Sequence, residues 1–177
     1  MRRFFLLVPI LFVAPLAVLA QGPPMSPEIQ ANTYTTTSPQ ALPSVAMDGA
    51  GDFVVVWPTS DGDGYGVAGR AFDPTGAPLT AQFAVNTYTT SDQYNCAVAA
   101  DRNGDFVVVW TSYAQIGAGA DVFARRYVNG NPTGPEFLVN TYTTGDQYVF
   151  GPQTVAMAPS GEFVVVWTST GQDGDGY

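Results

Sequence analysis

The sequence predicts an all-β fold in which antiparallel four-stranded units are repeated in tandem. Phe-Val-Val-Val-Trp occurs at 53–57, 106–110 and 163–167, and Asn-Thr-Tyr-Thr-Thr occurs at 32–36, 86–90 and 140–144. Two unrelated strings that keep nearly the same spacing indicate one structural unit of about 54 residues, copied along the chain. A further observation is that no stretch after residue 20 has helical periodicity.

Each unit is predicted to begin with a hairpin. A short first strand (44–47, 97–100 and 154–157) leads into a turn that is closed by Gly51, Gly104 or Gly161. The Phe-Val-Val-Val-Trp strand follows, and its unbroken apolar run indicates a strand covered on both faces. We therefore expect one set of its alternate side chains to form the repeated core: Phe53, Val55, Trp57, Phe106, Val108, Trp110, Phe163, Val165 and Trp167.

Two further strands are expected in each unit, a third over 67–72 and 122–127 and a fourth over 82–87 and 136–141. Four antiparallel strands in a unit of this size are typical of a propeller blade. An immunoglobulin-like sandwich needs about 100 residues, and a β-solenoid has shorter coils and fewer hairpins. The sequence therefore predicts antiparallel four-stranded blades in tandem, β-propeller-like but incomplete, with about two and a half blades.

The first twenty residues are predicted to be a signal peptide. Arg2 and Arg3 precede an apolar stretch, and Val18-Leu19-Ala20 predicts cleavage before Gln21. The alternative, a retained membrane anchor, needs roughly 20 apolar residues, more than this stretch supplies. We expect export, to a secreted, periplasmic or cell-surface location. The remaining segments are a linker (21–27), a lone outer strand (28–36), repeat 1 (37–90), repeat 2 (91–144) and a partial repeat 3 (145–177).

The charge of the chain excludes one class of partner. After residue 20 there is no Lys and no His, and four Arg face fifteen acidic residues, a formal charge of −11. Such a surface repels phosphate backbones, so nucleic-acid binding is excluded. Bound calcium would relieve the repulsion between acids, although the charge also serves solubility alone. Cys96 is the single cysteine, so the chain forms no internal disulfide, and we expect this side chain to be buried.

Three acidic stretches are candidate calcium ligands. Two are Asp-Gly-Asp-Gly loops that follow the central strands, and the third is a hairpin turn with oxygen ligands at alternate positions. Repeat 2 lacks the acidic loop, which favours a polar turn as the competing interpretation. The hairpin has no downstream bidentate Glu, so an Asx turn competes there. The candidate metal ligands are Asp61, Asp63, Asp173, Asp175, Asp101, Asn103 and Asp105.

Tyr65 and Tyr177 border the acidic loops and are the candidate ligand-contact residues. The three Trp of the central strands could stack on sugars, but their fixed position in each copy favours packing between units. Catalysis has little support, because without His or Lys the common nucleophile-and-base arrangements cannot be assembled. A carboxylate pair of the glycosidase kind stays open, but we expect no enzyme activity.

The units resemble a repeat of large secreted bacterial surface proteins, of the form Val-Ala-Met-Asp-x-x-Gly-Asp-Phe-Val-Val-Val-Trp, Gln-Asp-Gly-Asp-Gly-Tyr and Glu-Phe-x-Val-Asn-Thr. The resemblance covers about residues 28–177 and implies β-propellers beside calcium-binding or adhesion modules, with no shared catalytic residues. The expected function is an exported scaffold or interaction module. A calcium-stabilised carbohydrate-binding or adhesin-like module is the alternative. The expected partners are other blades of a longer chain or a self-oligomer, and glycans or surface proteins.

Overall fold

The computed structural model describes residues 28–33, 40–174 and 176, and every regular element in these ranges is a β-strand. All strand pairs are antiparallel, so the prediction of an all-β, antiparallel fold is confirmed. Within the same ranges, no helix has the length and hydropathy needed to cross a membrane. The predicted signal peptide and linker lie outside the described residues.

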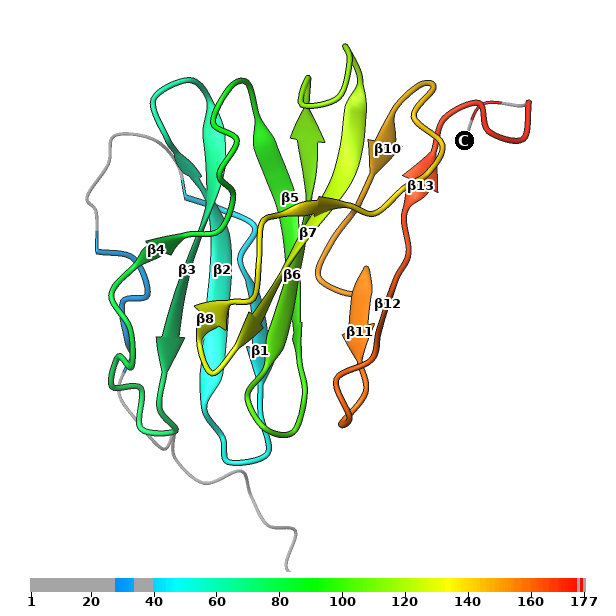
Figure 1. Cartoon of the computed structure of the whole chain (residues 1–177). Helices are drawn as coiled ribbons and strands as arrows, with labels where there is room; N and C mark the ends of the chain where they lie inside the picture. The colour runs from blue at the N-terminus through cyan, green and yellow to red at the C-terminus, as the bar shows by residue number, and fades with distance from the viewer. Residues whose placement is uncertain (1–27, 34–39, 175, 177) are drawn as a thin grey trace, which may run out of the picture.

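Unit 1 is a four-stranded sheet in sequence order (Figure 1). It contains β1 (Ser44–Met47), β2 (Phe53–Ser60), β3 (Tyr65–Phe72) and β4 (Phe83–Ala84). The β1–β2 turn needs the left-handed backbone that Gly51 adopts, with φ of 93°. The predicted first strand is found with the expected bounds, β2 and β3 are longer than predicted, and the fourth strand is only two residues long.

Unit 2 repeats this arrangement with longer strands. It contains β5 (Gln93–Ala100), β6 (Phe106–Tyr113), β7 (Ala120–Val128), β8 (Asn131–Pro132) and β9 (Phe137–Leu138). Strands β5, β6, β7 and β8 are adjacent in that order, and β9 also pairs with β7. A register shift between Tyr94 and Ala97 interrupts the β5–β6 pairing. Asn95 lies in this interruption with φ of 54°, and Leu42 has φ of 52° at the same place before β1.

Unit 3 is smaller and its strands form two separate pairs. Strand β10 (Gln147–Tyr148) pairs with β13 (Thr168–Ser169), and β11 (Val155–Met157) pairs with β12 (Phe163–Val165). The hairpin β11–β12 is the predicted first and second strand of the third copy, each shorter than expected. Strand β12 ends at Val165, before the Trp of Phe-Val-Val-Val-Trp, although Val166 N still donates to Thr154 O at 2.9 Å.

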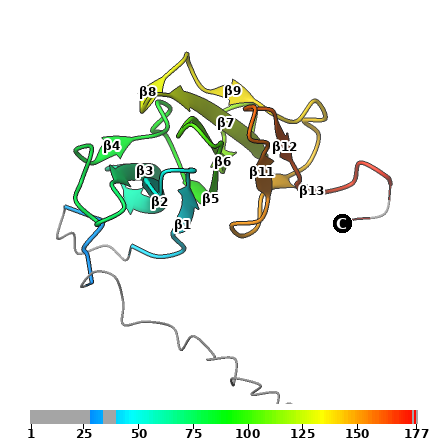
Figure 2. The same ribbon diagram turned by 90° about the horizontal axis from the view of Figure 1, so that it is seen from below.

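The three units lie side by side in sequence order (Figure 2). Alternate side chains of the central strand point to opposite neighbours. In unit 2, the leading face carries Phe106, Val108 and Trp110 and packs on unit 1, whereas the trailing face carries Val107 and Val109 and packs on unit 3. The strand β6 is therefore buried on both sides, as its unbroken apolar run predicts.

The predicted repeated core is formed fully only in unit 2, where Phe106, Val108 and Trp110 are all buried. Among the equivalent residues of unit 1, Trp57 is buried and Phe53 and Val55 are half-buried. In unit 3, Phe163 and Val165 are half-buried against unit 2. The prediction is wrong for Trp167, which is 39% exposed. Trp110 stacks on Phe123 of the adjacent β7, and no third strand of unit 3 lies among the described residues to support Trp167 in this way.

Residues 28–33, which lie in the predicted lone outer strand, run as irregular chain beside unit 1, and 34–36 are outside the described residues. Thr33 N donates to Gln82 Oε1 at 3.0 Å. One repeat later, Thr87 N donates to Glu136 Oε2 at 2.6 Å. The segment 28–33 therefore contacts unit 1 as the outer segment 82–87 of unit 1 contacts unit 2, although the predicted strand is absent there.

Candidate functional site

The Asn of the Asn-Thr-Tyr-Thr-Thr motif is a buried structural residue. Asn86 Oδ1 accepts from Val67 N at 2.7 Å, and Asn86 Nδ2 donates to Tyr88 O at 2.8 Å. Asn140 makes the same pair of bonds one repeat later, to Val122 N at 2.8 Å and Tyr142 O at 3.0 Å. The side chain bonds to the third strand of its unit beyond the end of the short outer strand, and it fixes the turn that follows, which explains why the motif recurs.

The Tyr of the same motif joins neighbouring units. The hydroxyl of Tyr88 donates to the carbonyl oxygen of Ala114 at 2.8 Å, in the β6–β7 loop of unit 2. The hydroxyl of Tyr142 donates to the carbonyl oxygen of Gly171 at 3.3 Å, after β13 of unit 3. Both hydroxyls therefore hold the loop of the next unit at the upper edge of the molecule in Figure 1.

The acidic loop of unit 1 connects β2 and β3 at this edge. Asp61 Oδ1 accepts from Asp63 N at 3.3 Å, and Asp63 Oδ2 accepts from Ser91 N at 3.4 Å. Asp61 also reaches over Gly66, since a Cβ atom at Gly66 would lie 2.8 Å from Asp61 Oδ2. Both carboxylates thus bond to backbone amides, Asp61 within the loop and Asp63 at the start of repeat 2.

Unit 2 places its carboxylate differently. Its loop 114–119 carries no acid, but Asp121 occupies the strand position of Gly66. Asp121 is buried and accepts from Asn140 Nδ2 at 2.7 Å. Burial raises the pKa of the Asp121 carboxyl, and the bond from Asn140 opposes that rise. A carboxylate therefore lies near the motif Asn in both units, but it comes from Asp61 in unit 1 and from Asp121 in unit 2.

The hairpin turns at the lower edge are Asx turns. Asp101 is buried, and its Oδ1 accepts from Asn103 N at 2.7 Å and from Asp105 N at 3.0 Å. In unit 1, Asp48 Oδ1 accepts from the amides of Ala50 and Asp52 in the same way. The interpretation of this stretch as an Asx turn is confirmed, and Asp105 Oδ1 accepts separately from Asn129 N at 3.1 Å.

The candidate calcium ligands are dispersed between these two edges. Among residues 28–33, 40–174 and 176, no three His, Cys, Asp or Glu side chains come together as a group that could hold a metal ion. Asp173 is exposed near the C-terminal end, and Asp175 and Tyr177 lie outside the described residues. Calcium binding at the seven candidate ligands stays a prediction.

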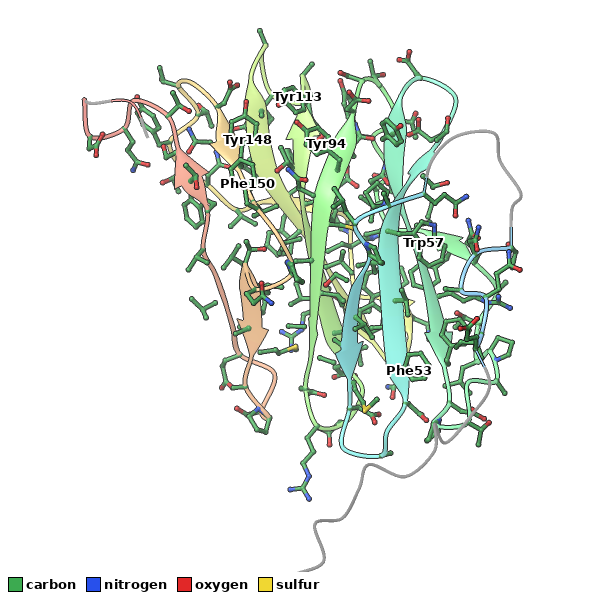
Figure 3. All side chains as sticks on the ribbon, turned by 180° about the vertical axis from the view of Figure 1, so that it is seen from behind. Phe53, Trp57, Tyr94, Tyr113, Tyr148 and Phe150 are labelled. Atoms are coloured by element: carbon green, nitrogen blue, oxygen red, sulfur yellow. The ribbon has the colours of Figure 1, made fainter. Side chains whose placement is uncertain are left out.

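A row of aromatic side chains crosses from unit 2 to unit 3 at the upper edge (Figure 3). The ring of Tyr94 stacks on that of Tyr113 with centroids 5.4 Å apart, and Tyr113 lies 6.1 Å from Tyr148. Their hydroxyls form a chain, from Tyr94 to Tyr113 at 2.8 Å and from Tyr113 to Tyr148 at 3.2 Å. Burial and the bond to Tyr148 raise the pKa of Tyr113 to about 12. We call these three residues the tyrosine row.

A cavity of about 400 Å³ lies at the corresponding place between units 1 and 2. Tyr65, which the sequence singles out as a ligand-contact candidate, is in its wall, and Asp92 Oδ1 accepts from Tyr65 N at 3.1 Å. The cavity is lined by Ala41, Leu42, Pro58, Tyr65, Asp92 and Tyr94. Sequence reasoning missed Tyr94 and Asp92, although Asp-Gln-Tyr recurs at 92–94 and 146–148.

Cys96 does not supply a nucleophile. The side chain is buried in the core between units 1 and 2, and burial raises the pKa of its thiol to about 12. A thiol that holds its proton at neutral pH is a poor nucleophile. The prediction that Cys96 packs as a small apolar residue is confirmed.

Comparison with known proteins identifies no relative: no protein family, no curated protein and no solved structure matches this chain. The function is therefore argued from the geometry of the three units and of the cavity between two of them.

Proposed function

We propose that the chain is an exported, non-enzymatic segment of β-propeller-like blades that acts as a scaffold by stacking on a further blade. Each unit corresponds to one blade, with the hairpin of the first two strands followed by a third strand and a short outer strand. Units 1 and 2 carry all four strands, which supports this proposal over a sandwich of two large sheets.

The observation that carries the proposal is the exposed trailing face of unit 3. Val164 and Val166 are 60% and 57% exposed. Their equivalents are Val54 and Val56 in unit 1 and Val107 and Val109 in unit 2, and all four are 4% exposed or less, because the next unit covers them. This pair of valines is buried at both junctions within the chain and exposed on unit 3. The exposed pair therefore fits the leading face of another unit.

The opposite end of the row offers such a leading face. Val45 and Met47 of β1 are each 61% exposed, whereas Val98, which stands in β5 where Val45 stands in β1, is buried against unit 1. Trailing and leading faces on opposite ends make a heterologous, head-to-tail contact, which closes into a ring or extends as a filament. The occupant that we propose is a blade of the same repeat, here unit 1 of a second copy.

The experiment measures association of the chain from Gln21 onward by analytical ultracentrifugation over a range of concentrations. We expect concentration-dependent association, which Val164→Asp/Val166→Asp abolishes without change in the circular dichroism spectrum. Ile116→Asp is the matched control, since Ile116 is 41% exposed in the β6–β7 loop of unit 2. A monomer at every concentration, or equal association of both variants, would refute the proposal.

Export is tested separately. Mass spectrometry of the protein recovered outside the cytoplasm is expected to give a mature chain that begins at Gln21. A chain that retains Arg2 and Arg3 and stays with the membrane would contradict this part of the proposal.

The alternative function, a calcium-stabilised carbohydrate-binding module, requires a metal site and a sugar site. The described acids supply no three-acid group. The cavity beside Tyr65 has two tyrosine residues in its lining and a volume of about 400 Å³, enough to accept a ligand of that size.

A further inference from the structure

We propose that the cavity between units 1 and 2 binds the phenol ring of a tyrosine side chain that a partner polypeptide presents. This proposal is independent of the stacking of whole units, because the cavity lies inside one chain. It rests on a comparison of two junctions, that of units 1 and 2 and that of units 2 and 3. Their backbones correspond, but their side chains differ.

The backbones at the two junctions correspond. Leu42 and Asn95 occupy the same place before the first strand of their units, and both have the left-handed φ that few side chains adopt, 52° and 54°. The residue preceding each is Ala41 in unit 1 and Tyr94 in unit 2. Ala41 therefore stands where unit 2 carries the first ring of the tyrosine row.

The rings around this place also differ between the junctions. In unit 2, Tyr113 pairs across the strands with Ala120, whereas in unit 1 Ser60 pairs with Tyr65. The second and third strands of each unit therefore carry one aromatic ring, Tyr113 in unit 2 and Tyr65 in unit 1. The next unit adds a second ring, Tyr148 beside Tyr113 and Tyr94 beside Tyr65. The junction of units 2 and 3 thus has three rings, and the junction of units 1 and 2 has two. The missing ring is the one that Ala41 does not provide.

The cavity has room for an aromatic ring together with neighbouring atoms of the chain that carries it. Its volume of about 400 Å³ lies within the range of roughly 300–1,000 Å³ that is usual for small-ligand sites. Tyr65 and Tyr94 border it as aromatic walls, and Leu42 and Pro58 add apolar surface. Aromatic rings gain from stacked and edge-to-face contacts with such walls.

The polar group of the cavity, the carboxylate of Asp92, favours a ligand that donates a hydrogen bond. Asp92 Oδ1 accepts one bond, from Tyr65 N, and a carboxylate has about four acceptor positions. A phenol hydroxyl can donate to this carboxylate or to a neighbouring tyrosine hydroxyl, as Tyr94 donates to Tyr113 in the row. An anionic ligand is disfavoured by Asp92 and by the charge of −11 on residues 21–177.

The test uses N-acetyl-tyrosinamide as the probe and the chain from Gln21 onward as the protein. Saturation-transfer NMR and calorimetry are expected to show binding at one site. Ala41→Tyr supplies the missing ring, so we expect it to weaken binding at least tenfold, which corresponds to about 1.4 kcal/mol. Ala50→Tyr is the matched control, because Ala50 is exposed in the β1–β2 turn, far from the cavity lining, and its affinity should equal that of the wild type.

A second variant keeps the test decisive if Ala41→Tyr does not fold. Tyr65→Ala removes one aromatic wall and is also expected to weaken binding at least tenfold, with an unchanged circular dichroism spectrum. N-acetyl-phenylalaninamide, which lacks the hydroxyl donor, should bind more weakly than the tyrosine probe. Absence of binding to the tyrosine probe, equal binding to wild type and Ala41→Tyr, or binding of methyl glucoside in place of the phenol would overturn the proposal.

Discussion

Arg125 Nη1 donates a hydrogen bond of 2.9 Å to the carbonyl oxygen of Val85, which lies 40 residues earlier in the chain. The same guanidinium donates through Nε to Gly134 O at 3.2 Å within its own unit. Arg70 repeats both bonds one unit earlier, to Ala31 O at 3.2 Å and to Thr80 O at 3.3 Å. Two of the four Arg that follow residue 20 therefore connect each third strand to the outer segment of the preceding unit.

Removal of this connection is expected to destabilise the junction of units 1 and 2. Arg125→Ala leaves two partly buried carbonyl groups without donors and should lower the free energy of unfolding by about 1.5–3 kcal/mol. Arg125→Lys should recover only part of this, because an ammonium group does not present the two donors in the same fork. Arg102→Ala, at an exposed turn position, should change stability by less than about 0.5 kcal/mol. Urea unfolding measures all three, and equal effects at 125 and 102 would contradict this role.

The Trp residues of the repeated pentapeptide are expected to contribute unequally. Trp110 is completely buried between units 1 and 2, so Trp110→Ala should cost about 3–5 kcal/mol. Trp167 holds the same place in the third copy but is 39% exposed, and Trp167→Ala should cost about 1 kcal/mol. Thermal and urea unfolding of the two variants compare these values. If Trp167→Ala cost as much as Trp110→Ala, unit 3 would be packed more completely than this structure has it.

Alkaline pH is expected to weaken the tyrosine row. A tyrosine in the unfolded chain ionises near pH 10.0, whereas burial raises the pKa of Tyr113 in the fold to about 12. The unfolded state therefore releases its proton first. The contribution of Tyr113 to stability is complete below pH 10.0 and is lost as the pH rises to about 12. Urea unfolding across this range should show a smaller loss for Tyr113→Phe than for the wild type, and tyrosinate absorbance should report the late ionisation.

Because Asp61 of unit 1 and Asp121 of unit 2 occupy equivalent sites, substitutions at positions 61 and 66 should have non-additive effects on stability. Gly66→Asp places the side chain of unit 2 into unit 1, where Asp61 already reaches over Gly66. Two carboxylates in this place repel each other, so Gly66→Asp alone should be destabilising. Addition of Asp61→Ala should recover part of the loss, with a coupling energy of about 0.5–3 kcal/mol. Additive effects in the double-mutant cycle would show that the side chains at positions 61 and 66 do not interact.

Calcium is expected to leave the described part of the fold unchanged. The carboxylates of Asp61, Asp63 and Asp101 accept bonds from backbone amides, and the described acids form no three-membered group. A cation that binds only the folded state at 100 times its Kd adds about 2.7 kcal/mol. Thermal unfolding with millimolar calcium and with a chelator should give the same midpoint. A higher midpoint with calcium that disappears in Asp173→Asn would place a site in the C-terminal loop.

The parts of the fold that follow from local patterns could be predicted from the sequence. The bounds of β1 and the starts of β2 and β6 agree with the predicted hairpins, because Gly51 and Gly104 fix the turns and valine runs fix the strands. The outer strands β4 and β9 are much shorter than predicted. Their ends are held by Asn86 and Asn140 side chains, which replace ladder bonds in a way that strand propensity does not reveal.

The candidate site was less accessible to sequence reasoning. Tyr65 borders an acidic loop, which the sequence shows. The cavity beside it depends on Ala41, however, whose equivalent in unit 2 is Tyr94. Likewise, Asp121 and Asp61 share a place near the motif Asn without sharing a position in the repeat. Such relationships arise from packing between units, and an alignment of the three copies shows them only as differences.

Arg125, Tyr88 and Tyr142 each join a unit to an adjacent one, and Arg70 joins unit 1 to the segment 28–33. Units 1 and 2 thus each supply an arginine donor on one side and a tyrosine donor on the other. Duplication of one 54-residue stretch of the gene therefore inserts a unit that already fits both of its neighbours. A chain with one more copy is therefore expected to keep the same bonds at each of its junctions.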